Sequence, residues 1–263
     1  MALRFAGKHC AVVGGTGIIG SHIAKAFAAN GAVVSVLGRS AVDMRPALES
    51  RLQPYKPPIE ATSSTKGPNS HQFIRIDVSD AANIKSVFSS RPSNDGGQPH
   101  TVGPVDVLVN CAGISQTTLL KRTPDEELFN IVNTNLTAAM LVCKYANMQA
   151  QGCIINVSSL MAVKGALGTT AYAASKAGLI GFTRALCHEM SARSIRVNAL
   201  LPGWVDSEMW KCLKPELKEA YLRETPLRRV ASPDEVADAA VFLASNGFAN
   251  NCVLNLDGGM SAS

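Results

Sequence analysis

The stretch HCAVVGGTGIIGSHIAKAFAAN, residues 9–30, decides the fold of this chain. It opens with a short apolar run, passes three evenly spaced glycines, Gly14, Gly17 and Gly20, and continues as a helix-like pattern that stops at Gly31. Glycines placed this way let the chain turn tightly, and they let backbone N–H groups approach an anion at the helix N-terminus. Residues 9–30 therefore predict a strand, a phosphate-binding turn and a helix.

The rest of the chain repeats this alternation. Seven short runs rich in Val, Ile and Leu are strand candidates, at 9–13, 32–37, 72–76, 105–110, 153–157, 195–200 and 252–256. Such continuous apolar runs are typical of strands covered on both faces. Helix patterns lie between them, among them 233–245, with Ser232 as the expected N-cap and Pro233 at the first helical position. The pattern predicts an α/β fold, a Rossmann-like doubly wound seven-stranded parallel sheet with helices on both faces.

Two segments interrupt the alternation, at 54–70 and 89–104. Both are rich in Pro, Ser, Gly and Asn and contain almost no core-forming residues. They are interpreted as surface loops inserted into a single dinucleotide-binding domain that spans residues 1–263.

Composition excludes several classes of protein. The chain is 46% hydrophobic and 17% charged, and no apolar run approaches the roughly 20 residues of a membrane span. Its net charge of +5 suits anionic ligands, but the charges are scattered, so no nucleic-acid partner is expected. The seven cysteines are odd in number and form no C-x-x-C pair, which predicts free thiols and no metal site. The start of the chain runs directly into a strand, so we expect a protein that is not secreted, in the reducing cytoplasm or, as the alternative, the mitochondrial matrix.

The end of the second strand bears on cofactor choice. A site for NAD usually places an acidic residue there to bind the ribose 2′-hydroxyl, but this chain has Gly38 and Arg39, followed by Ser40. An arginine can bind a 2′-phosphate and stack on adenine, so NADP(H) is the predicted cofactor. Asp77 and Val78, after the third strand, stand where the adenine amino group is expected.

The stretch TTAYAASKAGL, residues 169–179, places Tyr172 and Lys176 four residues apart, on one face of a helix. A positive charge beside a phenol favours phenolate and lowers the phenol pKa, which suits general acid–base catalysis. Chance alone produces this spacing often enough that the pair needs support from other motifs.

That support is a resemblance to the short-chain dehydrogenase/reductase family over nearly the whole chain. The shared blocks are GGTGIIG (14–20), IDVSD (76–80), VLVNCAGI (107–114), NTNLT (133–137), INVSS (155–159), YAASK (172–176), RVNALLPGWVDSEM (196–209) and VLNLDGG (253–259). The resemblance implies that Tyr172 is the general acid and that Lys176 tunes it and binds the nicotinamide ribose. Ser159 would hold the substrate oxygen, with Ser158 as the competing serine, and Asn135 would anchor a water of the proton relay.

The cofactor site follows from the same resemblance. It would comprise Gly14, Thr16, Gly17, Ile19, Gly20, Arg39, Ser40, Asp77, Val78, Asn110, Ala112, Gly113, Tyr172, Lys176, Pro202, Gly203, Val205 and Ser207. Thr170 is expected to cap the helix of Tyr172. The chain departs from the single-domain branch of the family in having Ile18 in the glycine loop, and Asn250 and Asn251 where a Thr-Gly turn is usual; asparagine tolerates a left-handed turn.

Within the family, residues 171–186 and 225–245 are most similar to 3-oxoacyl-[acyl-carrier-protein] reductases. This implies NADPH-dependent reduction of a 3-oxoacyl thioester to a secondary alcohol, as in fatty acid biosynthesis. Two arginines with which bacterial members hold the carrier are replaced, one of them by His188, so acyl carrier protein and coenzyme A both remain open as carriers. The alternatives are an alcohol dehydrogenase of this family acting on a sugar, steroid or secondary metabolite, and a non-catalytic dinucleotide-binding subunit.

The resemblance also implies a homotetramer. Ala173, Ala174, Ala177, Gly178 and Gly181 would permit close approach of the Tyr172 helix to another copy, beside an apolar stripe of Leu179, Phe182 and Leu186.

Overall fold

In a computed structural model of the chain, which describes residues 3–57, 67–89 and 101–262, a parallel sheet forms the centre of the molecule. Its strand order is β3-β2-β1-β4-β5-β6-β7. The strands are β1 (His9–Val13), β2 (Val33–Gly38), β3 (Gln72–Arg75), β4 (Val105–Asn110), β5 (Met148–Val157), β6 (Arg196–Pro202) and β7 (Val253–Leu256). The predicted doubly wound seven-stranded α/β fold is confirmed.

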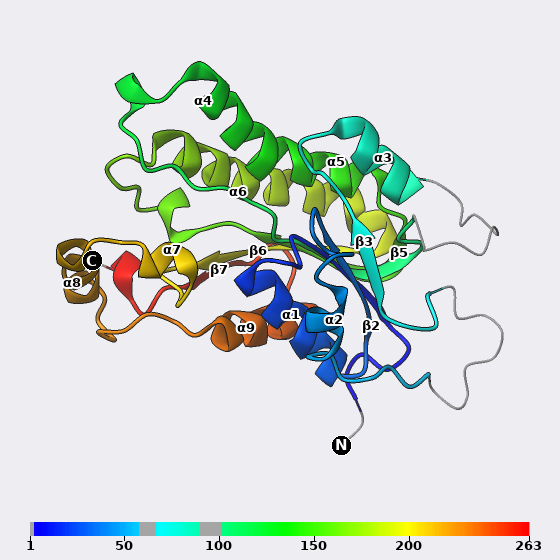
Figure 1. Cartoon of the computed structure of the whole chain (residues 1–263). Coiled ribbons are helices and arrows are strands. Elements are labelled where there is room, and N and C mark those ends of the chain that lie inside the picture. Colours follow the sequence, from blue (N-terminus) through cyan, green and yellow to red (C-terminus); the bar gives the residue numbers. More distant parts are fainter. Residues whose placement is uncertain (1–2, 58–66, 90–100, 263) are drawn as a thin grey trace.

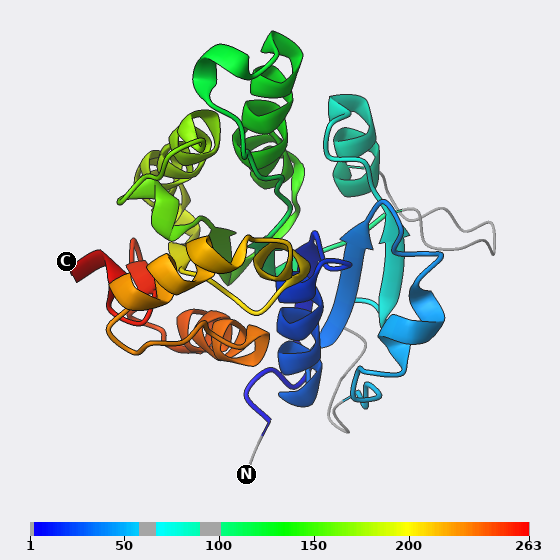
Figure 2. The same ribbon diagram turned by 60° about the vertical axis from the view of Figure 1, so that its left-hand side comes forward.

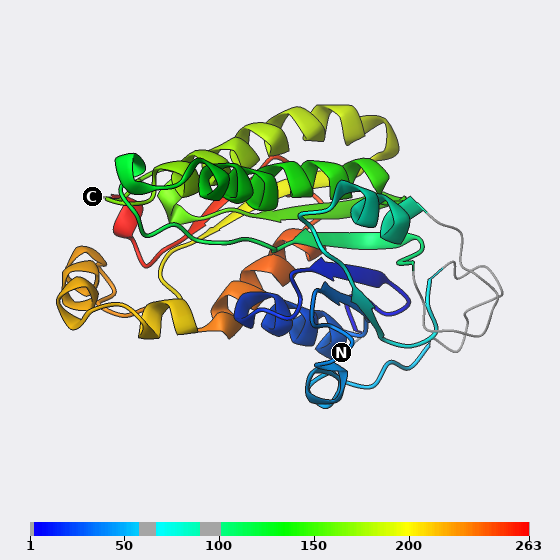
Figure 3. The same ribbon diagram turned by 45° about the horizontal axis from the view of Figure 1, so that its top comes forward.

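Helices cover both faces of the sheet (Figures 1 and 2). One face carries α1 (Ile18–Ala29), α2 (Arg45–Glu49) and α9 (Pro233–Ser245). The other carries α3 (Ala81–Ser89), α4 (Asp125–Val132), α5 (Ala138–Tyr145) and α6 (Thr170–Met190). The short helices α7 (Glu208–Lys211) and α8 (Pro215–Glu224) extend from one end of the sheet, near the C-terminus (Figure 3). No helix within the described ranges has the length and apolar character that crossing a membrane requires.

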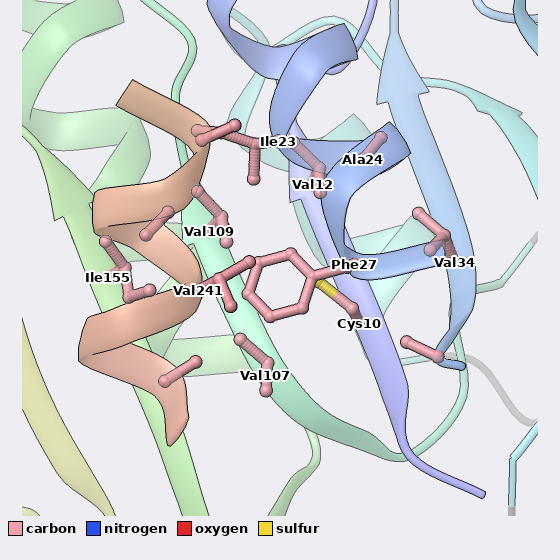
Figure 4. Packing of buried hydrophobic residues seen from close by; sticks show 14 of the residues in the cluster. Cys10, Val12, Ile23, Ala24, Phe27, Val34, Val107, Val109, Ile155 and Val241 are labelled. Carbon is pink, nitrogen blue, oxygen red and sulfur yellow. The ribbon is translucent and has the colours of Figure 1, made fainter. Parts of the chain in front are cut away.

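Alternating strand residues fill two separate cores. Cys10 and Val12 of β1 face α1 and α9, whereas Ala11 and Val13 face the layer of α3, α5 and α6. Figure 4 shows the first core, where the fully buried ring of Phe27 lies among side chains from the sheet and from α9. Burial on both faces explains why the strands are apolar without alternation.

The strand limits agree with the sequence analysis at β1 and β4 and differ most at β5. This strand begins at Met148, five residues before the predicted start. Val105 pairs with Met148, but the next pair joins Val107 to Cys153, so four residues of β5 bulge out of the ladder. Gln151 takes a left-handed φ of 62° in this bulge, which no apolar pattern signals.

Two local predictions are confirmed. Ser232 caps α9 in a capping box with Glu235, and Pro233 opens the helix. Asn251 adopts a left-handed φ of 57°, and the side-chain oxygen of Asn250 accepts a hydrogen bond from the Val197 N–H at 2.9 Å, so the Asn-Asn pair makes the turn before β7. Most of the two inserted loops, residues 58–66 and 90–100, lies outside the described residues.

Candidate active site

The glycine turn after β1 forms a cradle for a negatively charged group. Gly14 has a φ of +82°, and a Cβ there would lie 2.5 Å from the backbone nitrogen of Ala112, so only glycine fits. Helix α1 follows with Gly17 at its N-cap, where no described side chain caps the helix and no acidic residue occupies the first turn. The N–H groups of Ile18, Ile19 and Gly20 therefore have no partner within the helix, which suits a dinucleotide pyrophosphate.

The end of β2 excludes a side chain at position 38. A Cβ on Gly38 would lie 2.7 Å from the hydroxyl oxygen of Thr16, so no carboxylate fits there. Arg39 follows as an exposed side chain, with half-buried Ser40 behind it. This corner of the cradle is therefore lined by a cation and hydroxyl groups.

Asp77 and Val78 follow β3. One carboxylate oxygen of Asp77 accepts hydrogen bonds from the hydroxyl of Ser79 at 2.7 Å and from its backbone N–H at 3.0 Å. These two bonds lower the pKa of Asp77, and the positive charges of Arg39 and Arg75 lower it further. Asp77 is thus a carboxylate at neutral pH, near Arg39, with its second oxygen free of those bonds.

Asn110, at the end of β4, is one of the predicted cofactor residues. Its side-chain nitrogen donates to the Asn156 side chain at 2.9 Å and to the Cys143 sulfur at 3.2 Å. Asn156 in turn donates to the hydroxyl of Thr183. The side-chain nitrogen of Asn110 thus links β4 to β5, and Asn156 links β5 to α6. Farther along the same segment, Ala112 lies against the glycine turn and Gly113 lies beside Asn135 and Lys176.

The remaining predicted cofactor residues follow β6. Pro202 ends the strand, and a Cβ on Gly203 would lie 2.9 Å from the Cα of Asp257, so the chain passes closely here. Val205 is buried and bridges to Ala231. The hydroxyl of Ser207 accepts from the Trp210 N–H at 3.3 Å and so caps α7.

The predicted catalytic side chains meet at the carboxyl ends of β4 and β5. The hydroxyl of Ser159 lies beside the phenol of Tyr172, close enough to lower the pKa of the phenol. The ammonium of Lys176 lies 5.9 Å from the centre of the Tyr172 ring and donates to the Val157 carbonyl at 2.9 Å. A Cβ on Gly113 would lie 3.2 Å from both Lys176 Nζ and Asn135 Oδ1, so the absence of a side chain there lets these groups converge.

Asn135 lies within a π-helical turn, Asn133–Thr137, between α4 and α5. Its side-chain oxygen accepts from the Ile114 N–H at 2.8 Å, and its nitrogen donates to the Ile114 carbonyl at 2.9 Å and to the Ser175 hydroxyl at 3.1 Å. The amide is thus engaged on both sides. Isolated π-helical turns often occur at functional sites.

The two candidate serines have different surroundings. The hydroxyl of Ser158 is buried and donates to the Lys176 backbone carbonyl at 2.7 Å. Ser159 accepts from the Met161 N–H at 3.2 Å and faces Tyr172. Of the two, only Ser159 adjoins the phenol.

Burial dominates the protonation of the site. It lowers the pKa of Lys176 to about 8, and raises the pKa of Tyr172 although the neighbouring Ser159 hydroxyl lowers it. The expected lowering of the phenol pKa by Lys176 is therefore absent, because desolvation of the buried phenol outweighs its stabilising contacts. Burial also raises the pKa of Cys111, beside Lys176, to about 11, so this thiol is protonated at neutral pH.

The cap of α6 was wrongly predicted. Thr170 is the first helical residue, and Thr169, at the N-cap, makes no side-chain capping bond. The side chain of Gln116 accepts instead from the N–H groups of Ala171 and Tyr172, at 2.8 and 3.2 Å. No local pattern in the sequence marks Gln116 as this cap, because it lies 55 residues before Ala171.

An aromatic cluster adjoins the predicted catalytic side chains. The Trp204 ring lies 4.5 Å from the Tyr221 ring and 5.6 Å from the Trp210 ring, between centroids. Trp204, Tyr221 and Tyr172 pack against one buried group of Leu160, Met161 and Met260. This apolar wall suits a substrate with a hydrophobic portion.

Comparison with known proteins agrees with this geometry. The family profile described as enoyl-(acyl carrier protein) reductase, a short-chain dehydrogenase/reductase profile, matches residues 16–261. The chain belongs to the short-chain dehydrogenase/reductase family. This family uses a nicotinamide dinucleotide, and membership in it makes this chain an oxidoreductase.

Among curated members of the family, a 3-oxoacyl-[acyl-carrier-protein] reductase FabG of Chlamydia trachomatis is 38% identical over 260 residues, which cover 97% of each chain. A 3-oxoacyl-[acyl-carrier-protein] reductase of Homo sapiens is 34% identical, over 96% of this chain and 98% of its own. Carbonyl reductase family member 4 of Danio rerio is 34% identical, over 95% and 96%. The similarity thus extends over nearly the full length of all three.

The two serines provide a matched prediction. Ser159→Ala removes the hydroxyl beside the phenol, so we expect kcat for ketone reduction to fall by about 100-fold or more with cofactor affinity unchanged. Ser158→Ala removes the buried hydrogen bond to the Lys176 carbonyl, which stays within the hydrogen-bonding pattern of α6, so we expect the free energy of unfolding to fall by about 1 kcal/mol, with a smaller loss of kcat. Steady-state kinetics and urea unfolding measure both effects. Equal losses of kcat in the two variants would contradict the assignment.

Proposed function

We propose that this protein is an NADPH-dependent reductase that converts the ketone of a 3-oxoacyl thioester into a secondary alcohol. The observation that carries the proposal is the convergence of the Ser159 hydroxyl, the Tyr172 phenol and the Lys176 ammonium beside a group of apolar side chains. The names of the relatives from Chlamydia trachomatis and Homo sapiens support the thioester substrate.

The reaction follows from the protonation states of the site. Bound reduced nicotinamide supplies a hydride to the carbonyl carbon, and the oxygen then gains negative charge. Tyr172 is protonated at neutral pH because burial raises its pKa, so it can donate its proton to that oxygen. Ser159 holds the same oxygen, and Lys176, with a pKa of about 8, supplies positive charge close to the phenol at neutral pH.

NADP(H) is the proposed cofactor, because position 38 has no room for the carboxylate that would bind a ribose 2′-hydroxyl. Exposed Arg39 lies at the same corner and can pair with a 2′-phosphate. Gly14 to Gly20 would hold the pyrophosphate, and Lys176 the nicotinamide ribose.

The segment after β6 bears on the carrier of the acyl group. In this segment, residues 211–229, two basic side chains have acidic partners: Lys211 pairs with Glu208 at 2.8 Å, and Arg229 pairs with Glu235 at 2.6 Å. Its acidic residue Glu224 pairs with Lys164, which lies outside the segment, at 3.2 Å. The other charges of residues 211–229 are Lys214, Lys218, Arg223 and Arg228 against Glu216 and Glu219, and this excess of positive charge suits the phosphate of phosphopantetheine or coenzyme A. Either carrier fits this surface.

Turnover against a substrate panel tests the proposal. The panel holds acetoacetyl-CoA, acetoacetyl-acyl-carrier-protein, a 2-enoyl thioester, a sugar and a steroid ketone, each with NADPH. We expect the 3-oxoacyl thioesters to give the highest kcat/KM, and Tyr172→Phe to bind NADPH normally while losing about 10²- to 10⁴-fold of that rate. Preference for the enoyl thioester would favour the activity in the matched profile's description. Preference for the sugar or steroid would favour the alcohol dehydrogenase alternative, and no turnover a non-catalytic subunit.

We further propose that the chain works as one reductase domain in a reducing compartment, the cytoplasm or the mitochondrial matrix. Its seven cysteines are all free thiols, four of them buried. Such thiols persist where glutathione and thioredoxin keep them reduced.

A homotetramer is the proposed assembly. Leu179 and Leu186 are buried within their own chain, so the predicted apolar stripe faces the core. The opposite side of α6 exposes Ala174, Ala177 and Gly181, which leaves a smooth face for another copy. Light scattering at micromolar concentration should give four times the chain mass, and Ala177→Arg should give a smaller particle. A monomeric wild-type protein contradicts the proposal.

Arg39 is predicted to select the phosphorylated cofactor. Arg39→Asp removes the partner of the 2′-phosphate and adds repulsion, so kcat/KM should move from NADPH towards NADH by about 2–4 kcal/mol, roughly 30- to 1,000-fold. Arg4→Asp, the same charge change before the amino end of β1, is the control and should keep the preference. An unchanged preference in Arg39→Asp means that another residue recognises the phosphate.

The pKa of Lys176 leads to a prediction of how kcat/KM depends on pH. Its pKa of about 8 means that the ammonium is present below pH 8 and is lost above it. We expect kcat/KM for NADPH, which reports the free enzyme, to be flat below pH 8 and to decline above it. Lys176→Arg, slower overall, should lose this decline because a guanidinium stays charged. A decline that persists unchanged in Lys176→Arg belongs to another group.

A further inference from the structure

The backbone of Tyr172 is held on both sides by side chains outside the predicted catalytic group. Its N–H donates to the side-chain oxygen of Gln116 at 3.2 Å. Its carbonyl accepts from the hydroxyl of Ser175 at 2.7 Å. Neither Gln116 nor Ser175 carries a role in the proposed reaction.

These two contacts belong to a ring that hydrogen bonds form together with the backbone from Ile114 to Gln116. Ser175 accepts from the side chain of Asn135 at 3.1 Å, and Asn135 binds both backbone groups of Ile114, at 2.8 and 2.9 Å. Ile114 lies two residues before Gln116 on the segment that leaves β4. The ring therefore returns to Tyr172, and it fixes both the phenol-bearing residue and Asn135 to the same short segment.

The surroundings of Gln116 fix the orientation of its side chain. Its side chain is 2% exposed. The amide nitrogen donates to the Thr118 carbonyl and the Thr123 hydroxyl, both at 3.1 Å, which orients the oxygen toward the helix. The oxygen then meets two first-turn N–H groups of α6, those of Ala171 and Tyr172, which no residue of the helix can satisfy.

We propose that Gln116 is the positioning residue for the catalytic tyrosine, holding the first turn of α6 at the distance from the β4 segment that aims the phenol at the substrate oxygen. The inference rests on the proposed role of Tyr172 as proton donor. The short range of proton transfer makes the placement of the phenol matter more than the stability of the helix, since small displacements of a reacting group can cost about 100-fold in rate.

Two substitutions of similar size separate positioning from simple stabilisation. Gln116→Met removes every hydrogen bond of the side chain, and we expect kcat for ketone reduction to fall by about 10- to 100-fold with KM for NADPH within about threefold. Gln116→Glu keeps the acceptor and should recover most of this kcat. Its negative charge at the first turn of α6 should also raise the Tyr172 pKa by about one unit. Ser232→Ala, which removes the cap of α9, is the control for lost capping and should leave kcat unchanged.

The Tyr172 pKa can be read without any substrate, as the difference in tyrosinate absorbance between each protein and its Tyr172→Phe counterpart. The proposal is overturned if Gln116→Met keeps wild-type kcat, or if Gln116→Glu is as slow as Gln116→Met and leaves the Tyr172 titration in place. If Gln116→Met does not fold, Gln116→Glu together with Ser175→Ala, which opens the ring at its other side and should also lower kcat, decides the question. A wild-type protein inactive on all ketones refutes the proposed function alone, since the titration still tests the position of Gln116.

Discussion

The buried ammonium of Lys176 is the constraint on which the site depends. Lys176 as a whole is 4% exposed, and across residues 3–57, 67–89 and 101–262 no carboxylate forms an ion pair with it. A charge in such surroundings is costly unless polar groups surround it, and the fall of its pKa to about 8 expresses that cost. The Val157 carbonyl accepts a hydrogen bond from the ammonium, and Gly113, which has no side chain, leaves room for it.

The parallel sheet makes this arrangement possible. Because all strands run in one direction, the segments that leave β1, β4, β5 and β6 emerge at the same edge. Each brings a different component: backbone N–H groups after β1, the Gly113 segment after β4, Ser159 after β5 and the aromatic wall after β6. Helix α6 then returns across the face with Tyr172 in its first turn and Lys176 one turn later. The cores on both faces hold these segments in fixed positions relative to one another. The packing of the fold therefore helps to fix the positions of the reacting groups, in addition to their own hydrogen bonds.

Short stretches of sequence predict those features of the fold that depend on neighbouring residues alone. The glycine turn, the strands buried on both faces and the Ser232 cap each leave a pattern within a few residues, and each lies where it was expected. The bulge in β5 arises from how β5 pairs with β4, and the capping of α6 arises from Gln116, 55 residues before Ala171. Neither can be seen in one stretch of sequence. Asn110 shows the same limit, since its direction depends on Asn156 and Thr183 in two other elements.

The lysine and the tyrosine also show why spacing predicts contact better than it predicts protonation. Residues four apart on a helix do share a face, and the Lys176 ammonium does lie 5.9 Å from the centre of the Tyr172 ring. The sign of the net pKa shift, however, is set by desolvation, which depends on everything packed around the ring. A phenol with a raised pKa holds its proton at neutral pH, and a lysine with a pKa near 8 still holds most of its charge. Both groups are therefore already in the forms that the proposed carbonyl reduction needs, whereas alcohol oxidation with the phenolate as base must first remove a proton from a buried group. Burial, which disfavours the charged form of both groups, thus favours proton transfer from the phenol to the substrate at neutral pH.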